Sequence, residues 1–287
     1  MGVVNILSYY LRQIRQNFWI GSFSIFPEDI VKHAISTRLG GVSKKPFDSL
    51  NLALHVGDEA ENVLMNRKRF AASLDLKAED IVTPNQVHSD KVMRVVENHR
   101  GKGALNYDDA ISETDALITN TPNLPLMLCF ADCVPVLFVD VDNHAIGIAH
   151  AGWKGTMSKI AAKTLMAMTD EFGTDPTKCL AGIAPSIGSC CYEVGENVVN
   201  ACKESFPNHI DKLIINRDGK VYIDLWQANL LQLLEAGMSE ENIDIARECT
   251  CCKSSWYFSY RAAHHSGQSE TGRIAAIISL RENLDIS

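Results

Sequence analysis

A cysteine and a histidine stand on two apolar segments joined by a short turn, and together they could bind a metal or form a nucleophile and base. Cys133 lies in the almost continuous apolar run 125–141, and His150 ends the segment 144–150. The Asp-Asn pair at 142–143 is a turn signal, so the two segments predict a β-hairpin. If the pair forms a two-residue loop, Cys133 and His150 lie diagonally opposite on one face of the sheet.

The register of this hairpin decides whether the two side chains can meet. A shift of one residue would turn them to opposite faces of the sheet. In the predicted register Cys133 faces Gly152, but Pro135 lacks the ladder donor and could introduce a bulge. The hairpin therefore permits a shared site without requiring one.

A thiolate and two imidazoles suit zinc, and three protein ligands leave open the position that a catalytic site needs. His88, in the loop-like segment 83–92, is the favoured third ligand. Each residue also has an ordinary interpretation, since a single histidine is commonly a surface or core residue and a buried cysteine a small apolar one. A metal-free alternative is a cysteine hydrolase or amidase, with Cys133 as nucleophile and His150 as base.

Helices and strands must position these residues. Helical periodicity covers residues 59–74, 155–172 and 224–237, and strand patterns cover 125–141, 144–150, 179–185 and 273–280. Asp224 is the predicted N-cap of the third helix. Because the elements interleave without a regular βαβ rhythm, they predict an α/β or α+β fold with a mixed sheet. No internal repeat or Pro/Ser-rich linker interrupts the chain, which favours a single domain.

Composition is that of a soluble globular protein, with 46% hydrophobic and 22% charged residues among 287. The formal net charge of −8 argues against a nucleic acid or an anionic membrane surface as partner. We read no signal peptide and no membrane span, and therefore expect a cytoplasmic protein. The nine cysteines are then expected to be free thiols. No obligate protein partner is indicated.

Seven segments share their residues and order with one known family. They are STRLGGVS (36–43), NLALHVGD (51–58), NQVHSDKV (85–92), FADCVPVLF (130–138), AHAGWKGT (149–156), APSIGSCCYEVG (184–195) and FSYRAAH (258–264). Through them the chain resembles the YfiH-like family, also called the polyphenol-oxidase or laccase-domain family, which includes purine nucleoside phosphorylases. The resemblance runs from about residue 34 to residue 281.

The resemblance implies a three-layer α/β/α fold with mixed sheets, related to cysteine-hydrolase-like folds. Residues 31–287 would form one catalytic domain, and residues 1–30 an N-terminal extension. It implies zinc on His88, Cys133 and His150, with copper the less favoured ion. It also implies phosphorolysis of purine nucleosides (adenosine, inosine and methylthioadenosine) to base and ribose 1-phosphate, with adenosine deamination as a second activity. Nucleoside and phosphate would then be the partners.

Phosphate needs an anion site. Arg38, followed by two glycines, could offer a guanidinium and backbone N–H groups, although a turn with a surface arginine is the ordinary interpretation. Lys154 and Arg261 could add charge, and Asn51 and His55 are candidates for contacts with the substrate. The family usually reads Tyr-Arg-Arg-Asp where this chain has Tyr-Arg-Ala-Ala at 260–263, so only the first arginine is matched.

Two carboxylates compete as proton carriers. Asp90 stands two residues after His88, at the offset of the glutamate in zinc deaminases. Asp132 adjoins Cys133, but neighbours on a strand point to opposite faces, so Asp132 needs a local irregularity to reach the metal.

A second cysteine group could hold a structural zinc ion. Cys190 and Cys191 are adjacent, and Cys249 and Cys252 have CxxC spacing. Free thiols are the favoured interpretation, because an isolated CxxC is a weak signal. Trp153 and Trp226 are expected to pack in the core.

Two other function classes are less expected. A multi-copper oxidase needs closely spaced imidazole pairs, whereas no two of the nine histidines are separated by a single residue. One His/Cys/His site cannot supply four-electron reduction of oxygen. A non-catalytic interaction protein would leave unexplained why a thiol, two imidazoles and several basic groups recur in the matched loops.

Overall fold

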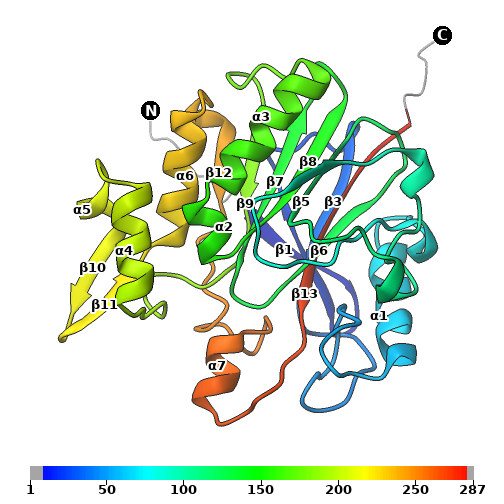
Figure 1. Cartoon of the computed structure of the whole chain (residues 1–287). Coiled ribbons are helices and arrows are strands. Elements are labelled where there is room, and N and C mark those ends of the chain that lie inside the picture. Colours follow the sequence, from blue (N-terminus) through cyan, green and yellow to red (C-terminus); the bar gives the residue numbers. More distant parts are fainter. Residues whose placement is uncertain (1–8, 283–287) are drawn as a thin grey trace, which may run out of the picture.

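Two β-sheets pack face to face in this computed structural model, which describes residues 9–282 (Figure 1). The five-stranded sheet is antiparallel, with the order β1 (Tyr9–Arg15), β2 (Phe18–Phe23), β3 (Val31–Ser36), β13 (Ile274–Leu280) and β6 (Leu126–Phe130). The six-stranded sheet is mixed, with the order β12 (Ile243–Ile245), β9 (Leu180–Ile183), β7 (Val134–Asp140), β8 (Ala145–Ala151), β5 (Ala116–Thr119) and β4 (Val92–Arg94).

Helices cover the outer faces of both sheets. Leu128 and Ile278 of one sheet and Leu137 and Ile148 of the other lie in one buried apolar cluster between the sheets. On the outer side of the six-stranded sheet pack α3 (Ile160–Phe172) and α6 (Leu225–Glu235), whereas α1 (Ala60–Ala72) covers the five-stranded sheet on the opposite side (Figure 1). The fold is a mixed α/β single domain with four layers, α/β/β/α, so the predicted three layers are wrong. The relation to cysteine-hydrolase-like folds remains a prediction.

The apolar run 125–141 explains the extra layer. It was expected to be one strand, but it contributes β6 to one sheet and β7 to the other. The chain crosses between the sheets at residues 131–133, where Asp132 has a φ of 88°. A left-handed φ at a non-glycine residue ends a strand, and sequence periodicity gives no sign of it.

The predicted register of the β7–β8 hairpin is confirmed. Pro135 lies opposite His150 and Val134 opposite Ala151, with no bulge along the pair. The turn is longer than predicted, because the last pair is Asp140 with Ala145. The carboxylate of Asp140 accepts hydrogen bonds from the backbone N and side-chain amide of Asn143, which closes the longer turn without changing the register.

Most predicted elements are present. The helices predicted at 59–74 and 224–237 are α1 and α6, and Asp224 caps α6 by accepting from the backbone N of Gln227 at 2.9 Å. The helix predicted at 155–172 is instead two helices, α2 (Trp153–Met157) and α3, because Lys159 between them has a φ of 63°. The strands predicted at 179–185 and 273–280 are β9 and β13.

Residues 9–26 are part of the domain. β1 and β2 continue the five-stranded sheet beyond β3, and Phe23 and Phe26 are buried between the sheets. The segment predicted to be an extension, residues 1–30, therefore contributes two strands to the sheet from residue 9 onward. Residues 1–8 of that prediction, and residues 283–287 of the predicted catalytic domain, lie outside the described residues.

The remaining elements surround the sheets. They are α4 (Glu196–Ser205), α5 (Ile210–Leu213), the hairpin β10 (Ile214–Arg217) and β11 (Lys220–Ile223), α7 (Tyr260–His265), and 3₁₀ turns at Ala78–Asp80, Glu97–His99, Tyr107–Asp109 and Glu240–Asn242. Among residues 9–282, no helix is long and apolar enough to cross a lipid bilayer.

Candidate active site

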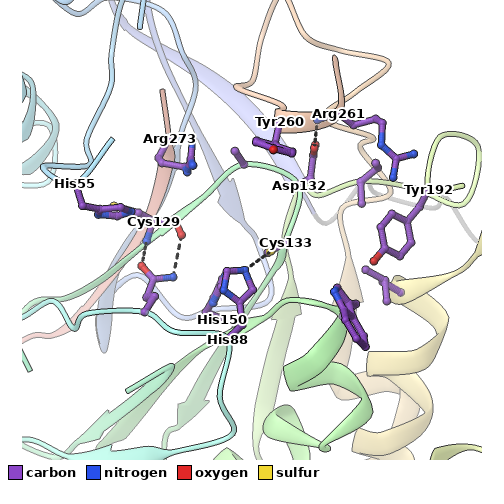
Figure 2. A pocket seen from close by; sticks show the side chains of 15 residues that line it. His55, His88, Cys129, Asp132, Cys133, His150, Tyr192, Tyr260, Arg261 and Arg273 are labelled. Carbon is purple, nitrogen blue, oxygen red and sulfur yellow. Dashed lines mark hydrogen bonds between the residues drawn. The ribbon is translucent and has the colours of Figure 1, made fainter. Parts of the chain in front are cut away.

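His88, Cys133 and His150 meet at one point of the structure. Their potential ligand atoms all lie within 4.8 Å of one another, and the Cys133 Sγ lies 3.7 Å from the His88 Nε2. Zinc bound to one sulfur at about 2.3 Å and nitrogens at about 2.1 Å in a tetrahedron needs ligand atoms roughly 3.4–3.6 Å apart. The three side chains stand at one end of a cavity of about 360 Å³ (Figure 2).

The local backbone explains the convergence. Cys133 follows the crossing between the sheets, and His150 lies on the paired strand β8, as the hairpin register requires. Gly152 begins α2 at the same point. A Cβ on Gly152 would lie 2.7 Å from the His88 Cδ2 and 3.1 Å from the Cys133 Sγ, so only glycine leaves room for both side chains.

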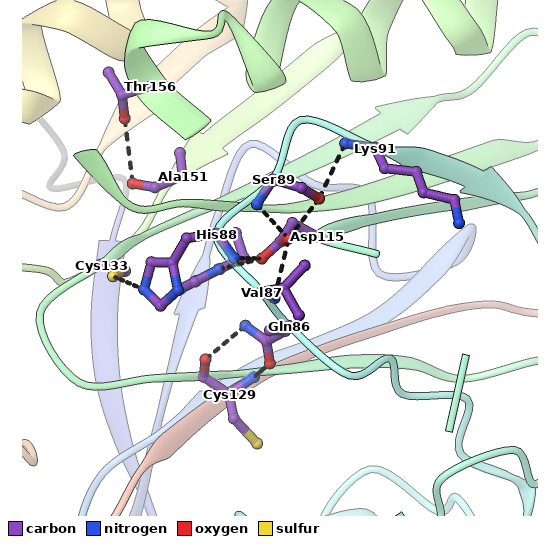
Figure 3. A network of polar contacts seen from close by, with 11 residues as sticks. Gln86, Val87, His88, Ser89, Lys91, Asp115, Cys129, Cys133, Ala151 and Thr156 are labelled. Atoms are coloured by element: carbon purple, nitrogen blue, oxygen red, sulfur yellow. Dashed lines mark hydrogen bonds and ion pairs between the residues drawn. The ribbon is translucent and has the colours of Figure 1, made fainter. Parts of the chain in front are cut away.

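Asp115 holds both histidines in place, and Figure 3 shows it beside the loop that carries His88. Its side chain is fully buried, and one carboxylate oxygen lies 2.8 Å from the His150 Nδ1. The carboxylate also accepts hydrogen bonds from the backbone N–H groups of Val87, His88 and Ser89 and from the Ser89 hydroxyl, at 2.7–3.2 Å. A single carboxylate thus fixes the ring of one histidine and the loop that carries the other. With Nδ1 engaged, the Nε2 of His150 is left for a ligand.

The electrostatics of the site favour a thiolate. Burial opposes the charge on Cys133, but the imidazoles of His150 and His88 outweigh burial and lower the pKa of the thiol to about 6. Burial likewise opposes the charge on His150, yet Cys133 and Asp115 raise the pKa of this imidazole to about 9. Burial would raise the pKa of Asp115, but hydrogen bonds from His150 and Ser89 lower it to about 2. Without metal, the pair is therefore a thiolate beside an imidazolium.

Two further predicted residues line the same cavity. The irregularity at Asp132 turns its carboxylate toward the cavity, where it accepts from the Thr250 hydroxyl and from the backbone N of Arg261, both at 2.7 Å (Figure 2). The guanidinium of Arg261 donates to the carbonyl oxygens of Cys191 and Glu193. Arg261 therefore joins the cavity wall to the loop behind it.

Other predicted residues make contacts elsewhere. The guanidinium of Arg38 donates to the carbonyl oxygens of Asp48 and Ser254 and lies 4.6 Å from the ring centre of Phe258. The amide of Asn51 is buried and bonded within its own loop and to the backbone N of Arg273.

Lys154 and Asp90 also lie apart from the residues that line the cavity. The Nζ of Lys154 stands 5.8 Å from the ring centre of Trp153, and Asp90 forms an exposed ion pair with Lys163. Trp226 packs against the backbone at Gly188, as expected, whereas Trp153 contributes to the cavity wall.

Sequence reasoning missed three residues of the site. Asp115 and Gln86 give no spacing signal, although Gln86 lies in the matched segment with His88. The amide of Gln86 forms two hydrogen bonds with the backbone of Cys129 at the end of β6, which anchors the loop of His88 to the other sheet. Arg273 lines the cavity just before β13, and no motif marked it.

Arg273 and His55 line the cavity to one side of the ligand residues (Figure 2). The Nη1 of Arg273 donates to the carbonyl oxygens of Thr271 and Gly272, and its guanidinium has no ion pair with a carboxylate within residues 9–282. Burial, together with the charges of Arg273 and other basic groups, lowers the pKa of His55 to about 4, so its imidazole is neutral. This side of the cavity therefore suits an anion.

The fold matches solved structures closely. The crystal structure of the Bacillus licheniformis hypothetical protein YfiH superposes with a TM-score of 0.88 at 36% identity, covering 94% of this chain and 99% of that chain. The crystal structure of YlmD from Geobacillus stearothermophilus gives a TM-score of 0.88 at 35% identity, covering 95% and 99%.

A family model described as multi-copper polyphenol oxidoreductase laccase matches residues 32–281, and the chain belongs to this family, as its motifs predicted. The purine nucleoside phosphorylase YlmD of Bacillus subtilis is 38% identical over 249 residues, covering 86% of this chain and 87% of that protein. The adenosine deaminase RL5 from an unknown prokaryotic organism is 34% identical over 242 residues, covering 83% and 92%.

Proposed function

We propose that this chain is a zinc-dependent purine nucleoside phosphorylase that also deaminates adenosine. The substrates would be adenosine, inosine or methylthioadenosine together with phosphate, in the cytoplasm. The names of the similar proteins support this reaction class. The observation that carries the proposal is one cavity lined both by a His/Cys/His ligand set and by Arg273, which forms no direct ion pair with a carboxylate of residues 9–282.

The three side chains are better explained as ligands of a zinc ion than as a site that works without metal. One thiolate and two imidazoles leave an open position, and the carboxylate of Asp115 behind His150 is the outer partner that zinc-binding histidines commonly have. Copper accepts the same atoms and is the less favoured ion. A bound zinc ion would act as a Lewis acid that polarises the substrate or lowers the pKa of water.

The chain's own side chains would bind and orient the substrates. Arg273 offers unused N–H groups to a phosphate oxygen pair, which suits a planar guanidinium. Trp153, Tyr192 and Tyr260 line the cavity with aromatic surface for a purine. The neutral imidazole of His55 can both donate and accept, as ribose hydroxyls require.

Proton transfer falls to Asp132. Within residues 9–282 it is the one carboxylate that lines the cavity, whereas the alternative carrier, Asp90, is paired with Lys163 outside it. In phosphorolysis a phosphate oxygen bonds to the ribose C1′ while the bond to the purine nitrogen breaks with its electron pair. The departing base takes up the proton that the attacking phosphate gives up, and Asp132 would relay this proton between them.

The test combines metal content with product analysis. Wild type, Cys133→Ala and the control Cys129→Ala, which removes a cavity thiol that is no ligand, would be incubated with adenosine with and without phosphate. Adenine release that depends on phosphate, lost in Cys133→Ala together with about one zinc per chain, supports the phosphorylase. Inosine formed without phosphate supports the deaminase. A folded wild type that yields neither product overturns the proposal.

A cysteine hydrolase is the second candidate, and the thiolate–imidazolium pair favours it. Cys133, His150 and Asp115 form a Cys–His–Asp series in which the carboxylate orients the imidazole. Zinc that requires Cys133 would reject this candidate. Laccase chemistry is disfavoured by the ligand atoms, because the two candidate metal groups within residues 9–282 are this one and a group of four cysteines.

A further inference from the structure

Four cysteine sulfurs gather at a second point, behind the cavity wall. Cys190 and Cys191 come from the loop after β9, and Cys249 and Cys252 from the loop before α7. All four Sγ atoms lie within 4.8 Å of one another, with Cys252 at 3.5 Å from Cys190 and 3.4 Å from Cys191. The two loops are more than fifty residues apart in sequence, so this gathering is a property of the fold.

The spacing is that of a tetrahedral ligand set. Zinc–sulfur bonds of about 2.3 Å place tetrahedral sulfurs roughly 3.8 Å apart. A disulfide needs sulfurs at about 2.05 Å and uses only two of them. Because Cys252 lies equally near Cys190 and Cys191, neither disulfide partner is favoured over the other. All nine cysteines are free thiols in the structure.

The backbone around the sulfurs is shaped to hold them. The carbonyl oxygen of Gly188 accepts from the backbone N–H groups of both Cys191 and Tyr192, which makes a tight turn. The backbone N of Gly188 donates to the Sγ of Cys249 at 3.3 Å. A Cβ on Gly188 would lie 2.8 Å from the Trp226 ring and 3.2 Å from the Cys190 Sγ, so glycine leaves room for both the ring and the sulfur. N–H groups directed at sulfur stabilise thiolates bound to metals.

Positive side chains lie next to the same loop. The guanidinium of Arg217 donates to the carbonyl oxygen of Cys190, and that of Arg261 to the carbonyl oxygen of Cys191. Four thiolates around one divalent cation carry a net charge of −2. Two adjacent guanidinium groups offset that charge without occupying a sulfur.

We propose that Cys190, Cys191, Cys249 and Cys252 bind one structural zinc ion as a tetrathiolate site. Four protein ligands close the coordination sphere, so this zinc ion does no chemistry of its own. It joins the loop that carries Tyr192 to the loop that leads to Arg261, and both of these residues line the catalytic cavity. Zinc here therefore stiffens one wall of the cavity without contacting substrate. The proposal does not depend on which reaction the cavity performs.

The experiment isolates the second site by emptying the first. In His88→Ala/Cys133→Ala, purified with reductant and with zinc supplied during expression, about one zinc per chain should remain. X-ray absorption should show four sulfur ligands at about 2.3 Å and no nitrogen. Adding Cys252→Ser should remove that zinc. The matched control adds Cys251→Ala instead and should leave the zinc in place. Cys251 lies between Cys249 and Cys252 in the sequence but does not belong to the group of four sulfurs.

Three results would overturn the proposal. One is a folded His88→Ala/Cys133→Ala protein that holds no zinc. Another is zinc with nitrogen or oxygen ligands in its absorption spectrum. The third is a disulfide among these cysteines, detected by mass spectrometry in the protein as purified. If Cys252→Ser does not fold, the absorption spectrum of the parent variant still decides between these outcomes and the proposed site.

Discussion

Replacing Asp115 by asparagine tests whether one buried carboxylate organises the metal site. The substitution keeps the shape of the side chain but removes its charge and one of its two acceptor oxygens. One oxygen accepts from the His88 N–H and faces the His150 Nδ1, and the other accepts from Val87 and from both groups of Ser89. Whichever oxygen becomes NH₂, at least two donors around the buried carboxylate lose their acceptor.

The size of the effect follows from these contacts. Each unsatisfied donor costs about 1–3 kcal/mol, so the loss of two acceptors should lower the free energy of unfolding by about 2–6 kcal/mol. Removing the outer partner of a metal-binding histidine commonly weakens metal binding 10–100-fold. That range corresponds to about 1.4–2.8 kcal/mol of zinc-binding free energy. Loss of the carboxylate also lowers the pKa of His150, because Asp115 is one of the groups that raise it.

Zinc affinity would be measured by competition with a chromophoric chelator at fixed pH, and stability by urea unfolding of the zinc-free protein. The matched control is Asp140→Asn. It also removes a buried carboxylate, but at the end of β7 that lies away from Cys133. The control should lose stability but keep the zinc affinity of wild type. If Asp115→Asn, shown to be folded, bound zinc within twofold of wild type, the assignment of Asp115 as the organising carboxylate would be refuted.

Three other predictions follow from the site and the core. Gly152→Ala suits the φ of −62° at this residue but places a methyl group against His88, so His88 must move, and chelator competition should find zinc affinity at least tenfold lower. The same overpacking should lower zinc-free stability by about 1–3 kcal/mol in urea unfolding. Arg273→Met should raise the KM for phosphate about 10–100-fold in steady-state assays and leave deamination unchanged. The control Arg38→Met should leave the KM for phosphate unchanged. Equal effects of the two substitutions would exclude Arg273 as the phosphate ligand. Burial, with a smaller effect of a nearby arginine, lowers the pKa of His33 from 6.5 to about 4. Between pH 6.5 and 4 the unfolded chain therefore binds more protons than the folded chain. The free energy of unfolding should fall by up to about 3 kcal/mol over this range. Urea unfolding of His33→Gln should show a smaller fall.

The sequence was sufficient for the hairpin because two constraints agree there. Apolar residues demand burial on both faces of β7 and β8, and the turn at 142–143 sets which residues pair. A turn of different length kept the same register, so Cys133 and His150 were correctly predicted to lie on one face. Local pattern and turn position are both short-range information, which periodicity can carry.

The sequence was insufficient where a residue acts through distant neighbours. Nothing adjacent to Asp132 predicts its left-handed φ, because the Thr250 and Arg261 groups that hold its carboxylate lie more than one hundred residues away. Arg38 looked like an anion ligand because glycines follow it, but its guanidinium binds carbonyl oxygens of two other loops. Conversely, Arg273 has no local motif and reaches the cavity because β13 pairs with β6, the strand that ends at the crossing.

The crossing at 131–133 explains why the site lies where it does. A strand that continued straight from β6 would keep Asp132 and Cys133 on opposite faces of one sheet, so they could not serve one cavity. Because the chain changes sheets at this point, Asp132 turns toward α7 while Cys133 turns toward His150, and both line the same space. Gln86 then ties the loop of His88 to the end of β6, and Asp115 ties it to β8. His150 lies on β8, Cys133 directly precedes β7, and the loop of His88 leads into β4, so all three ligands are carried by the six-stranded sheet, and Gln86 links them to the other sheet.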